Sequence, residues 1–265
     1  MTAAPKRLLI IAGSDSGGGA GIQADIKTAS AFGVYAMTAV TAVTAQNTKA
    51  ITAVHPVPAK IVAAQIDACL TDIGADAIKI GMLGSAAIVR AVAAAIAKPA
   101  RKIPVVLDPV LVSTGGAALL DARGAAALKK YLLPLAALVT PNIPEARALV
   151  GLRGASGKAM EEAGRELMAL GAGAALIKGG HGTRATVDDV LVWDRGVEIF
   201  AFPRLKTKHT HGTGCTYATA IACGLAQGQS LPLAVGRARD YVQKAIETAP
   251  ALGKGHGPLN HWVDK

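Results

Sequence analysis

The sequence HTHGTGCT, residues 209–216, combines the residue types of a phosphate-binding turn, and an apolar helix pattern follows it directly. Glycines let the backbone approach an anion closely. The unpaired N–H groups of a first helical turn bind negatively charged oxygen, with help from the helix macrodipole. Gly212, Thr213 and Gly214 are therefore predicted to form an anion hole that suits a transferring phosphoryl group. The alternative is that these glycines only cap the helix.

Cys215 lies in the first turn of that predicted helix. The positive end of a helix lowers the pKa of a thiol and favours the thiolate, so Cys215 is a candidate proton acceptor. A cysteine in an apolar helix is more commonly a small core residue, which is our interpretation of Cys69 and Cys223. His209, His211 and Cys215 also imitate zinc ligands. Because no fourth ligand follows at zinc spacing, we do not predict a zinc site there.

Two charged residues follow apolar runs that are typical of buried strands. Asp108 comes directly after residues 105–107, and Lys178 comes directly after residues 174–177. A carboxylate suits a hard cation such as Mg²⁺, and a lysine is a point charge that suits nucleotide phosphates. For Lys178 the alternative is an ordinary surface lysine.

Other polar positions allow both a structural and a functional interpretation. Asn142 and Glu145 have the spacing of a helix capping box, which needs no ligand. Gln46 follows an alternating Thr, Ala and Val pattern, and its amide could donate to a ring nitrogen and accept from a ring amine. A glutamine in an exposed turn would look the same. The glycine-rich residues 17–21 could cradle an anion or allow close helix packing, and we expect backbone contacts with a substrate.

The elements that must position these residues alternate along the chain. Strands are predicted at residues 7–12, 34–44, 76–80, 105–108, 138–140 and 174–177. Helices are predicted at residues 20–32, 58–73, 85–97, 121–132, 157–170, 214–226 and 231–248. The near-continuous apolar strands indicate a central, mostly parallel sheet flanked by helices, in an α/β fold of three layers. Residues 187–193 and 197–202 predict a small antiparallel hairpin at the sheet edge. In such a sheet ligands bind beyond the carboxyl ends of the strands, where the polar residues above lie.

The composition narrows the class of protein. The chain has 265 residues, of which 51% are hydrophobic, and without a linker we predict one domain over residues 1–265. The net charge of +10 favours anionic ligands without choosing among them. Two charge-free stretches, at residues 28–48 and 209–236, are interrupted by glycine and polar side chains, so no membrane span is predicted. Three cysteines without CxxC spacing predict reduced thiols and a cytoplasmic protein.

Two familiar phosphate motifs are absent. Residues 154–158 come closest to a Walker loop but have the wrong glycine spacing, and Ile22 stands where a dinucleotide fingerprint needs its third glycine. Seven other motifs occur instead: IAGSDSGGGAGIQADIKT (11–28), AQNT (45–48), KIGML (79–83), LDPV (107–110), TPNIPEA (140–146), KGGH (178–181) and HGTGCT (211–216). With these motifs, in this order, nearly the whole chain resembles the hydroxymethylpyrimidine/phosphomethylpyrimidine kinases of thiamine biosynthesis, within the ribokinase-like superfamily.

The resemblance implies that ATP phosphorylates the hydroxymethyl group of 4-amino-5-hydroxymethyl-2-methylpyrimidine (HMP) and then phosphorylates the product to the diphosphate. Cys215 would lie beside the substrate hydroxyl, where many superfamily members have an aspartate, and would act as base or shape the pocket. The implied catalytic residues are Cys215, Gly212, Thr213, Gly214 and Lys178. The implied pyrimidine-binding residues are Gln46, Asp25, Gly13, Met82 and Val110. Nucleotide contacts would come from Asp108, Asn142, Glu145, Lys178 and Thr213, with Mg²⁺ on Asp108 and Glu145. The resemblance also suggests a homodimer.

Three alternatives remain open at this point. A pyridoxal kinase of the same superfamily would also phosphorylate a hydroxymethyl group on an aromatic nitrogen ring. A nucleic-acid-binding protein would use the positive charge, but the basic residues are scattered and the aromatic residues form no stacking array, so no nucleic acid partner is expected. A non-catalytic pyrimidine sensor would not need the combination of Lys178, Asp108, Glu145 and Cys215.

Overall fold

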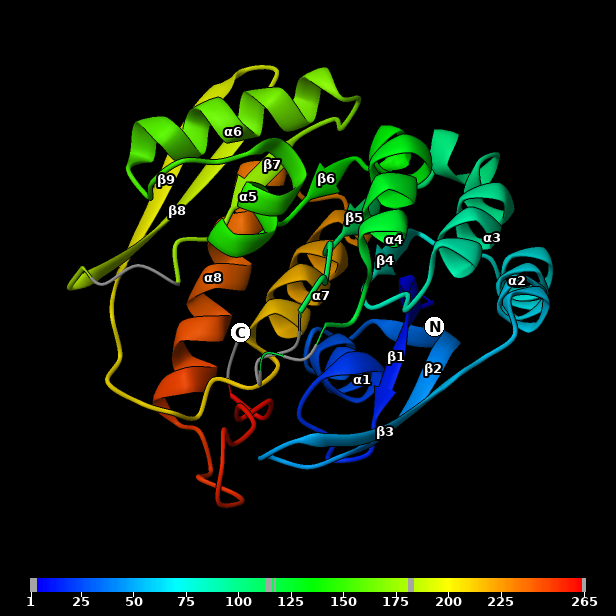
Figure 1. Ribbon diagram of the computed structural model, residues 1–265, viewed down its shortest axis with the longest axis horizontal. Helices are drawn as coiled ribbons and strands as arrows, with labels where there is room; N and C mark the ends of the chain where they lie inside the picture. Colours follow the sequence, from blue (N-terminus) through cyan, green and yellow to red (C-terminus); the bar gives the residue numbers. More distant parts are fainter. Residues whose placement is uncertain (1–3, 113–115, 117, 181–183, 264–265) are drawn as a thin grey trace.

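The computed structural model describes residues 4–112, 116, 118–180 and 184–263. Within these residues one nine-stranded sheet runs through the molecule in the order β3-β2-β1-β4-β5-β6-β7-β8-β9 (Figure 1). The strands are β1 (Arg7–Asp15), β2 (Tyr35–Gln46), β3 (Ile51–Pro56), β4 (Ala77–Ile80), β5 (Val105–Leu107), β6 (Leu138–Val139), β7 (Ala175–Ile177), β8 (Thr186–Trp193) and β9 (Gly196–Pro203). β1, β2 and β4–β7 pair in parallel, whereas β3, β8 and β9 join antiparallel.

Helices cover both faces of the sheet (Figure 1). One face carries α1 (Gly21–Ala31), α7 (Thr213–Ala226) and α8 (Leu231–Glu247). The other carries α2 (Ala59–Ala68), α3 (Ala86–Ile96), α4 (Ala122–Ala127), α5 (Ile143–Val150) and α6 (Gly157–Ala169). Successive strand residues point to opposite faces, so Leu9 packs into the second helix layer and Leu8 into the first. Every apolar residue of β4–β7 is therefore buried, which explains the continuous apolar runs in these strands.

The predicted three-layer architecture is confirmed, and so is the antiparallel hairpin, formed by β8 and β9 at one edge. Two elements were not predicted as such. β3 is an edge strand that is exposed along nearly its whole length, so it has no alternation of buried and exposed residues to predict it. The helix α5 has eight residues, too few for a clear period. The predicted helices at 58–73 and 121–132 each end in a π-helical turn, at Cys69–Ile73 and Leu128–Leu132.

The carboxyl ends of the parallel strands all meet at one edge of the sheet. β1 ends at Asp15 and β2 ends at Gln46, while Asp108 directly follows β5 and Lys178 directly follows β7. Polar residues that are far apart in the sequence are brought together there, as the sequence predicted. No helix in the described part of the chain is long and apolar enough to span a membrane.

Candidate active site

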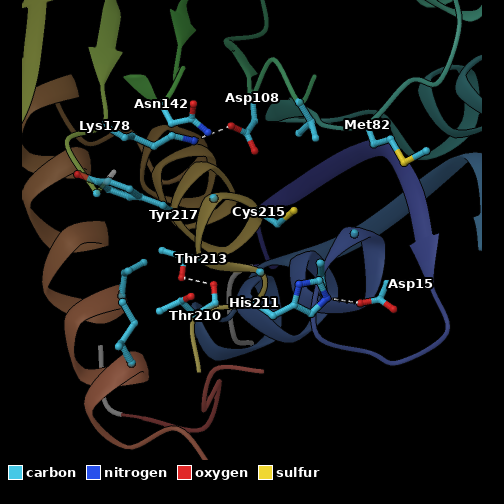
Figure 2. A pocket seen from close by; sticks show the side chains of 18 of the residues that line it. Asp15, Met82, Asp108, Asn142, Lys178, Thr210, His211, Thr213, Cys215 and Tyr217 are labelled. Atoms are coloured by element: carbon cyan, nitrogen blue, oxygen red, sulfur yellow. Dashed lines mark hydrogen bonds and ion pairs between the residues drawn. The ribbon is translucent and has the colours of Figure 1, made fainter. Parts of the chain in front are cut away.

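A cavity of about 500 Å³ opens at the carboxyl edge of the sheet. The N-terminal turn of α7 enters it from one side, and the ends of β1 and β2 and the segments after β4–β7 enclose it (Figure 2). Among the described residues, every predicted site residue except Asp25 lines this cavity: Gly13, Gln46, Met82, Asp108, Val110, Asn142, Glu145, Lys178, Gly212, Thr213, Gly214 and Cys215. His181, at the end of the KGGH motif, lies outside the described residues.

The start of α7 is held open toward the cavity by two glycines. Gly212 has a φ of 85°, and a Cβ atom there would overlap the backbone carbonyl of Gly19. A Cβ atom on Gly214 would lie 3.4 Å from both Asp108 Oδ2 and Lys178 Nζ, so this glycine borders the charged part of the site. The Thr213 N–H and hydroxyl both donate to the Thr210 carbonyl, at 3.3 and 2.7 Å. The prediction counted the Thr213 N–H among the groups that bind the anion, but this N–H is already paired. The N–H groups of Gly214 and Cys215, in the first turn of α7, have no partner within the helix.

Lys178 and Asp108 form an ion pair at the cavity wall. Lys178 Nζ lies 2.8 Å from Asp108 Oδ1, which also accepts from the Thr140 hydroxyl at 3.2 Å. Burial alone would lower the pKa of Lys178, but the carboxylates of Asp108 and Glu145 outweigh it and raise the pKa. The ammonium group therefore stays charged at the wall of the cavity.

Asn142 and Glu145 form the capping box of α5. The Asn142 side chain accepts from the Glu145 N–H at 2.9 Å, and the Glu145 carboxylate accepts from the Asn142 N–H at 2.8 Å. The capping box is therefore confirmed, and both residues also line the cavity, which leaves their functional role open to proposal. Burial raises the pKa of Glu145 to about 7, with Lys178 opposing the rise and Asp108 adding to it. The carboxyl group is consequently poised to change its charge near neutral pH.

The state of Cys215 differs from the sequence prediction. Burial raises the pKa of its thiol to about 11, although Lys79 nearby opposes the rise. The positive helix end is too weak to offset this desolvation, so Cys215 is a neutral thiol at pH 7 and the predicted thiolate is wrong. Figure 2 shows Cys215 between the Lys178–Asp108 pair and the His211–Asp15 pair.

Asp25 lies behind the cavity wall rather than on it. It is fully buried and pairs with the fully buried Lys79, Oδ2 to Nζ, at 2.8 Å. The other carboxylate oxygen accepts from the Thr219 hydroxyl at 2.7 Å, and Thr219 stands one helical turn after Cys215 on α7. This cluster ties α1, β4 and α7 together beneath the site. The family resemblance implies that Asp25 borders the pyrimidine pocket, whereas in the structure Asp25 does not line the cavity and supports the site from behind.

Asp15 uses the amides of the glycine-rich segment that the sequence offered for a substrate. Its carboxylate accepts the N–H groups of Gly17, Gly19 and Ala20, at 2.8, 3.2 and 2.9 Å. The N–H groups of Gly17, Gly19 and Ala20 are therefore already paired and cannot make the substrate contacts that the sequence predicted for this segment. Asp15 also contacts His211 at 2.8 Å. The sequence analysis did not assign Asp15 or His211 to the site, although Asp15 belongs to the motif at residues 11–28 and His211 to the motif at residues 211–216.

The far end of the cavity has a wall that no motif indicated. Asp189 on β8 pairs with Arg239 on α8 at 3.1 Å and accepts the Gly179 N–H at 2.8 Å, next to Lys178. Five apolar residues from β8, β9, α8 and the segment after β9 also line the cavity: Val187, Pro203, Leu205, Val242 and Ile246. The cavity therefore combines buried ion pairs with apolar walls.

The fold and the site together define a small-molecule kinase with a ribokinase-like fold, in which the start of α7, flanked by glycines, adjoins a lysine–carboxylate pair. The model of the phosphomethylpyrimidine kinase family matches residues 15–260. The chain belongs to this family.

Known relatives agree with this assignment, and a solved pyridoxal kinase shares the fold. The chain is 46% identical over 263 residues to hydroxymethylpyrimidine/phosphomethylpyrimidine kinase of Haemophilus influenzae, covering 97% of both chains. It is 49% identical over 254 residues to the thiamine biosynthesis bifunctional protein ThiED of Geobacter sulfurreducens; this match covers 96% of the chain but only 52% of that longer relative. An ADP complex of Bacillus subtilis pyridoxal kinase superposes with a TM-score of 0.89 at 35% identity, covering 97% of this chain and 98% of that one.

Proposed function

We propose that this chain transfers the terminal phosphoryl group of ATP to the hydroxymethyl group of HMP, and then to the phosphate of the resulting monophosphate. The observation that carries the proposal is that Gln46, the start of α7 and the Lys178–Asp108 pair all face one cavity. Family membership and a relative that forms an ADP complex support it. The apolar residues Val187, Leu205 and Val242 are proposed to contact the nucleotide base.

Phosphoryl transfer asks the protein mainly for alignment and for neutralisation of oxygen charge. The N–H groups of Gly214 and Cys215 are proposed to hold the transferred group, with Lys178 beside them as a fixed positive charge. Gln46 is proposed to hold the pyrimidine through its amide, while Gly13, Met82 and Val110 enclose the ring. The hydroxymethyl oxygen would then lie in line with the leaving nucleotide.

The carboxylates of Asp108 and Glu145 fit a magnesium ion. Both line the cavity, and Mg²⁺ is commonly held by one or two carboxylates together with substrate phosphates. Among the described residues, no group of three or more His, Cys, Asp or Glu side chains could hold a metal without such help. Bound Mg²⁺ would neutralise charge on the phosphate oxygens. Asn142 supports this arrangement by fixing Glu145 through the capping box.

Cys215 is proposed to shape the pocket rather than to act as a preformed base. Its thiol stays protonated at neutral pH, because burial raises its pKa to about 11. A loose transition state leaves most of the alcohol proton in place until late, so a strong base contributes little. The thiol can still contact the hydroxymethyl group as a small polarizable side chain.

We also propose that residues 1–265 act as one domain and that the protein is a cytoplasmic homodimer. The single sheet that joins the first and last strands supports one domain. The exposed edge strand β3 offers a surface for a second copy. Light scattering coupled to gel filtration tests the dimer, and a mass equal to one chain would contradict it.

The decisive experiment compares turnover of HMP, HMP monophosphate and pyridoxal with ATP and Mg²⁺. We expect both pyrimidines to be phosphorylated in preference to pyridoxal. Gln46→Leu should raise KM for HMP by roughly 5- to 150-fold, because a buried polar group of the substrate loses its partner at a cost of about 1–3 kcal/mol. KM for ATP serves as the internal control and should stay unchanged. Activity confined to pyridoxal would overturn the proposal in favour of a pyridoxal kinase, the fold of which this chain shares.

A further inference from the structure

The backbone that carries Lys178 lies between two neighbouring strands of the sheet. Toward β6, the Lys178 N–H donates to the Pro141 carbonyl at 2.9 Å. Toward β8, the ladder of paired residues ends at Ile177 and Val190. A buried backbone N–H needs an acceptor, so the residue after Lys178 has to find one beyond the end of this ladder.

The carboxylate of Asp189 supplies that acceptor. The Gly179 N–H donates to Asp189 Oδ1 at 2.8 Å, and both residues are buried. The two chains lie so close together here that a Cβ atom on Gly179 would overlap the backbone carbonyl of Asp188. The turn after β7 is therefore fixed by a glycine that fits against β8 and by a side chain of β8 that binds its N–H.

Arg239 on α8 provides the countercharge for this buried carboxylate. Its Nε lies 3.1 Å from Asp189 Oδ2, and the Arg239 and Asp189 side chains are 5% and 4% exposed. The guanidinium also donates from Nη1 to Gln243 at 3.1 Å and lies 4.3 Å from the centre of the Phe202 ring. Burial raises the pKa of Asp189, and Arg239 opposes this rise more than any other neighbour. With Oδ2 facing Arg239, Oδ1 is left for Gly179.

The cost of burying this pair points to a role other than stability. Moving two charges out of water is expensive, and apolar residues of similar volume often replace a buried ion pair without loss of stability. An apolar residue could not replace the acceptor for the Gly179 N–H. A buried N–H without an acceptor costs about 1–3 kcal/mol, so the segment would shift toward water or another partner and would carry Lys178 with it.

We propose that Asp189 is a positioning residue: by accepting the Gly179 N–H, it fixes the chain just after β7 and thereby the place of the Lys178 ammonium group beside the phosphates of ATP. That group lies 2.8 Å from Asp108 (Figure 2). Asp108 directs the end of the lysine side chain, whereas Asp189 fixes the backbone from which it extends. The inference rests on the proposed function, because it takes Lys178 as the residue that neutralises phosphate oxygens.

Two double variants isolate the acceptor. Asp189→Leu with Arg239→Met, the leucine variant, removes both charges and the acceptor. Asp189→Asn with Arg239→Met, the asparagine variant, removes the same charges but keeps an oxygen for the Gly179 N–H. Because apolar replacement of a buried ion pair is commonly tolerated, both variants should fold, and thermal unfolding checks this. If the leucine variant does not fold, Asp189→Val with Arg239→Met, which has a smaller side chain on β8, takes its place.

The turnover number for HMP is the main measurement. We expect kcat to be roughly 10- to 100-fold lower in the leucine variant than in the asparagine variant, since a small misplacement of a group at the reacting atoms has an effect of that size. The asparagine variant should stay within about tenfold of the wild type, and KM for HMP should change by less than about twofold in both, because Gln46 and the pyrimidine pocket are untouched. Equal kcat values in the two double variants would overturn the proposal.

The same comparison in a Lys178→Met background shows whether Asp189 acts through the lysine. Once the ammonium group is gone, its position no longer matters. Single-turnover rates of the leucine and asparagine variants should then agree within about threefold, because the two effects share one group and are not additive. A ratio as large as the one measured with Lys178 present would overturn the proposal, since a general structural role gives that result.

Binding of a non-hydrolysable ATP analogue separates the inference from the proposed function. A wild type that binds the analogue with Mg²⁺ but does not turn over HMP would overturn the proposed function alone. The affinity for the analogue, measured by calorimetry, then replaces kcat as the measurement. It should be about tenfold weaker in the leucine variant than in the asparagine variant, as expected for a displaced charged donor, and equal affinities would overturn the inference. A wild type that does not bind the analogue would overturn both.

Discussion

The ammonium group of Lys178 lies 2.8 Å from the carboxylate of Asp108, although 70 residues separate them in the sequence. The two residues follow β7 and β5, the strands on either side of β6, so the parallel sheet itself sets their distance. Gly214 on α7 lies next to the pair. Because glycine has no side chain, it leaves room between α7 and both charges. The space that we propose for the phosphoryl group is thus bounded by α7 and by the residues after β5 and β7.

Gly214→Ala tests this arrangement. The added methyl group would lie 3.4 Å from Asp108 and Lys178, which is ordinary contact, so the fold should be kept and the melting temperature should change little. The same methyl group would displace a bound phosphoryl group by about its own radius, and such a misplacement costs roughly 100-fold in rate. Steady-state kinetics and thermal unfolding measure the two effects.

Gly212→Ala is the counterpart with the opposite pattern. Its φ of 85° and the overlap with the Gly19 carbonyl leave no room for a side chain. The left-handed backbone alone costs about 1–2 kcal/mol in a residue other than glycine, so the melting temperature should fall clearly. If Gly214→Ala lost stability as Gly212→Ala does, or kept full activity, the proposed phosphate position would be incorrect.

Glu145 should make stability depend on pH. Because its pKa in the folded protein is raised to about 7 from an ordinary value of 4.5, the folded state holds the proton more tightly than the unfolded state. Its stabilising contribution is complete below pH 4.5 and is lost as the pH rises through 7, by up to about 3 kcal/mol. Glu145→Gln keeps the cap acceptor without the charge. Chemical denaturation of both ligand-free proteins is measured from pH 4.5 to 8. The unfolding free energy of the wild type, relative to that of Glu145→Gln, should fall as the pH rises through 7. Parallel curves of unfolding free energy against pH would contradict the raised pKa.

Removing one charge of the buried Asp25–Lys79 pair should lower the unfolding free energy more than removing both charges together. Lys79→Met leaves the Asp25 carboxylate without its cation in the core, which typically costs about 3–5 kcal/mol. Adding Asp25→Asn removes the stranded charge and keeps an acceptor for the Thr219 hydroxyl. The double variant should therefore recover much of the lost unfolding free energy in urea. A single variant as stable as the wild type would show that the pair is not tightly held.

Cys215 should react slowly with alkylating agents at neutral pH. With a thiol pKa of about 11, the rate should still rise nearly tenfold per pH unit between pH 8 and 10. Peptide mass spectrometry separates its modification from that of Cys69 and Cys223. Cys215→Ser should keep turnover within about tenfold, since no preformed thiolate is lost. Rapid alkylation at pH 7, together with a collapse of turnover in the serine variant, would restore the role of base.

The parts of the site that the sequence predicts well are those set by one strand. Asp108 and Lys178 each follow a fully buried run, Val105–Leu107 and Ala175–Ile177, and a parallel sheet necessarily brings such positions to one edge. The helix start at Gly212 has an equally local signal in its glycines. Local patterns and the general rule for parallel sheets therefore suffice for the phosphate side of the cavity.

Features that depend on packing between distant elements are not predictable in this way. Asp15 and His211 are 196 residues apart, and no local pattern links them. The helix end favours a thiolate at Cys215, but the burial that prevents it belongs to the complete fold. Asp25 belongs to the motif at residues 11–28, yet it lies behind the cavity wall, where it forms an ion pair with Lys79. In each case the chemistry follows from a neighbour that the sequence does not identify.

The loop before α7 contacts two segments that are far apart in the sequence. The Gly19 carbonyl lies against Gly212, and the His211 N–H donates to the Gly257 carbonyl at 3.2 Å. Synthesis proceeds from the N-terminus, so Gly19 is in place long before residue 257 leaves the ribosome. The loop before α7 can therefore form its contact with Gly19 before it forms the contact with Gly257. We expect the complete arrangement of this loop to form late in folding, after most of the sheet.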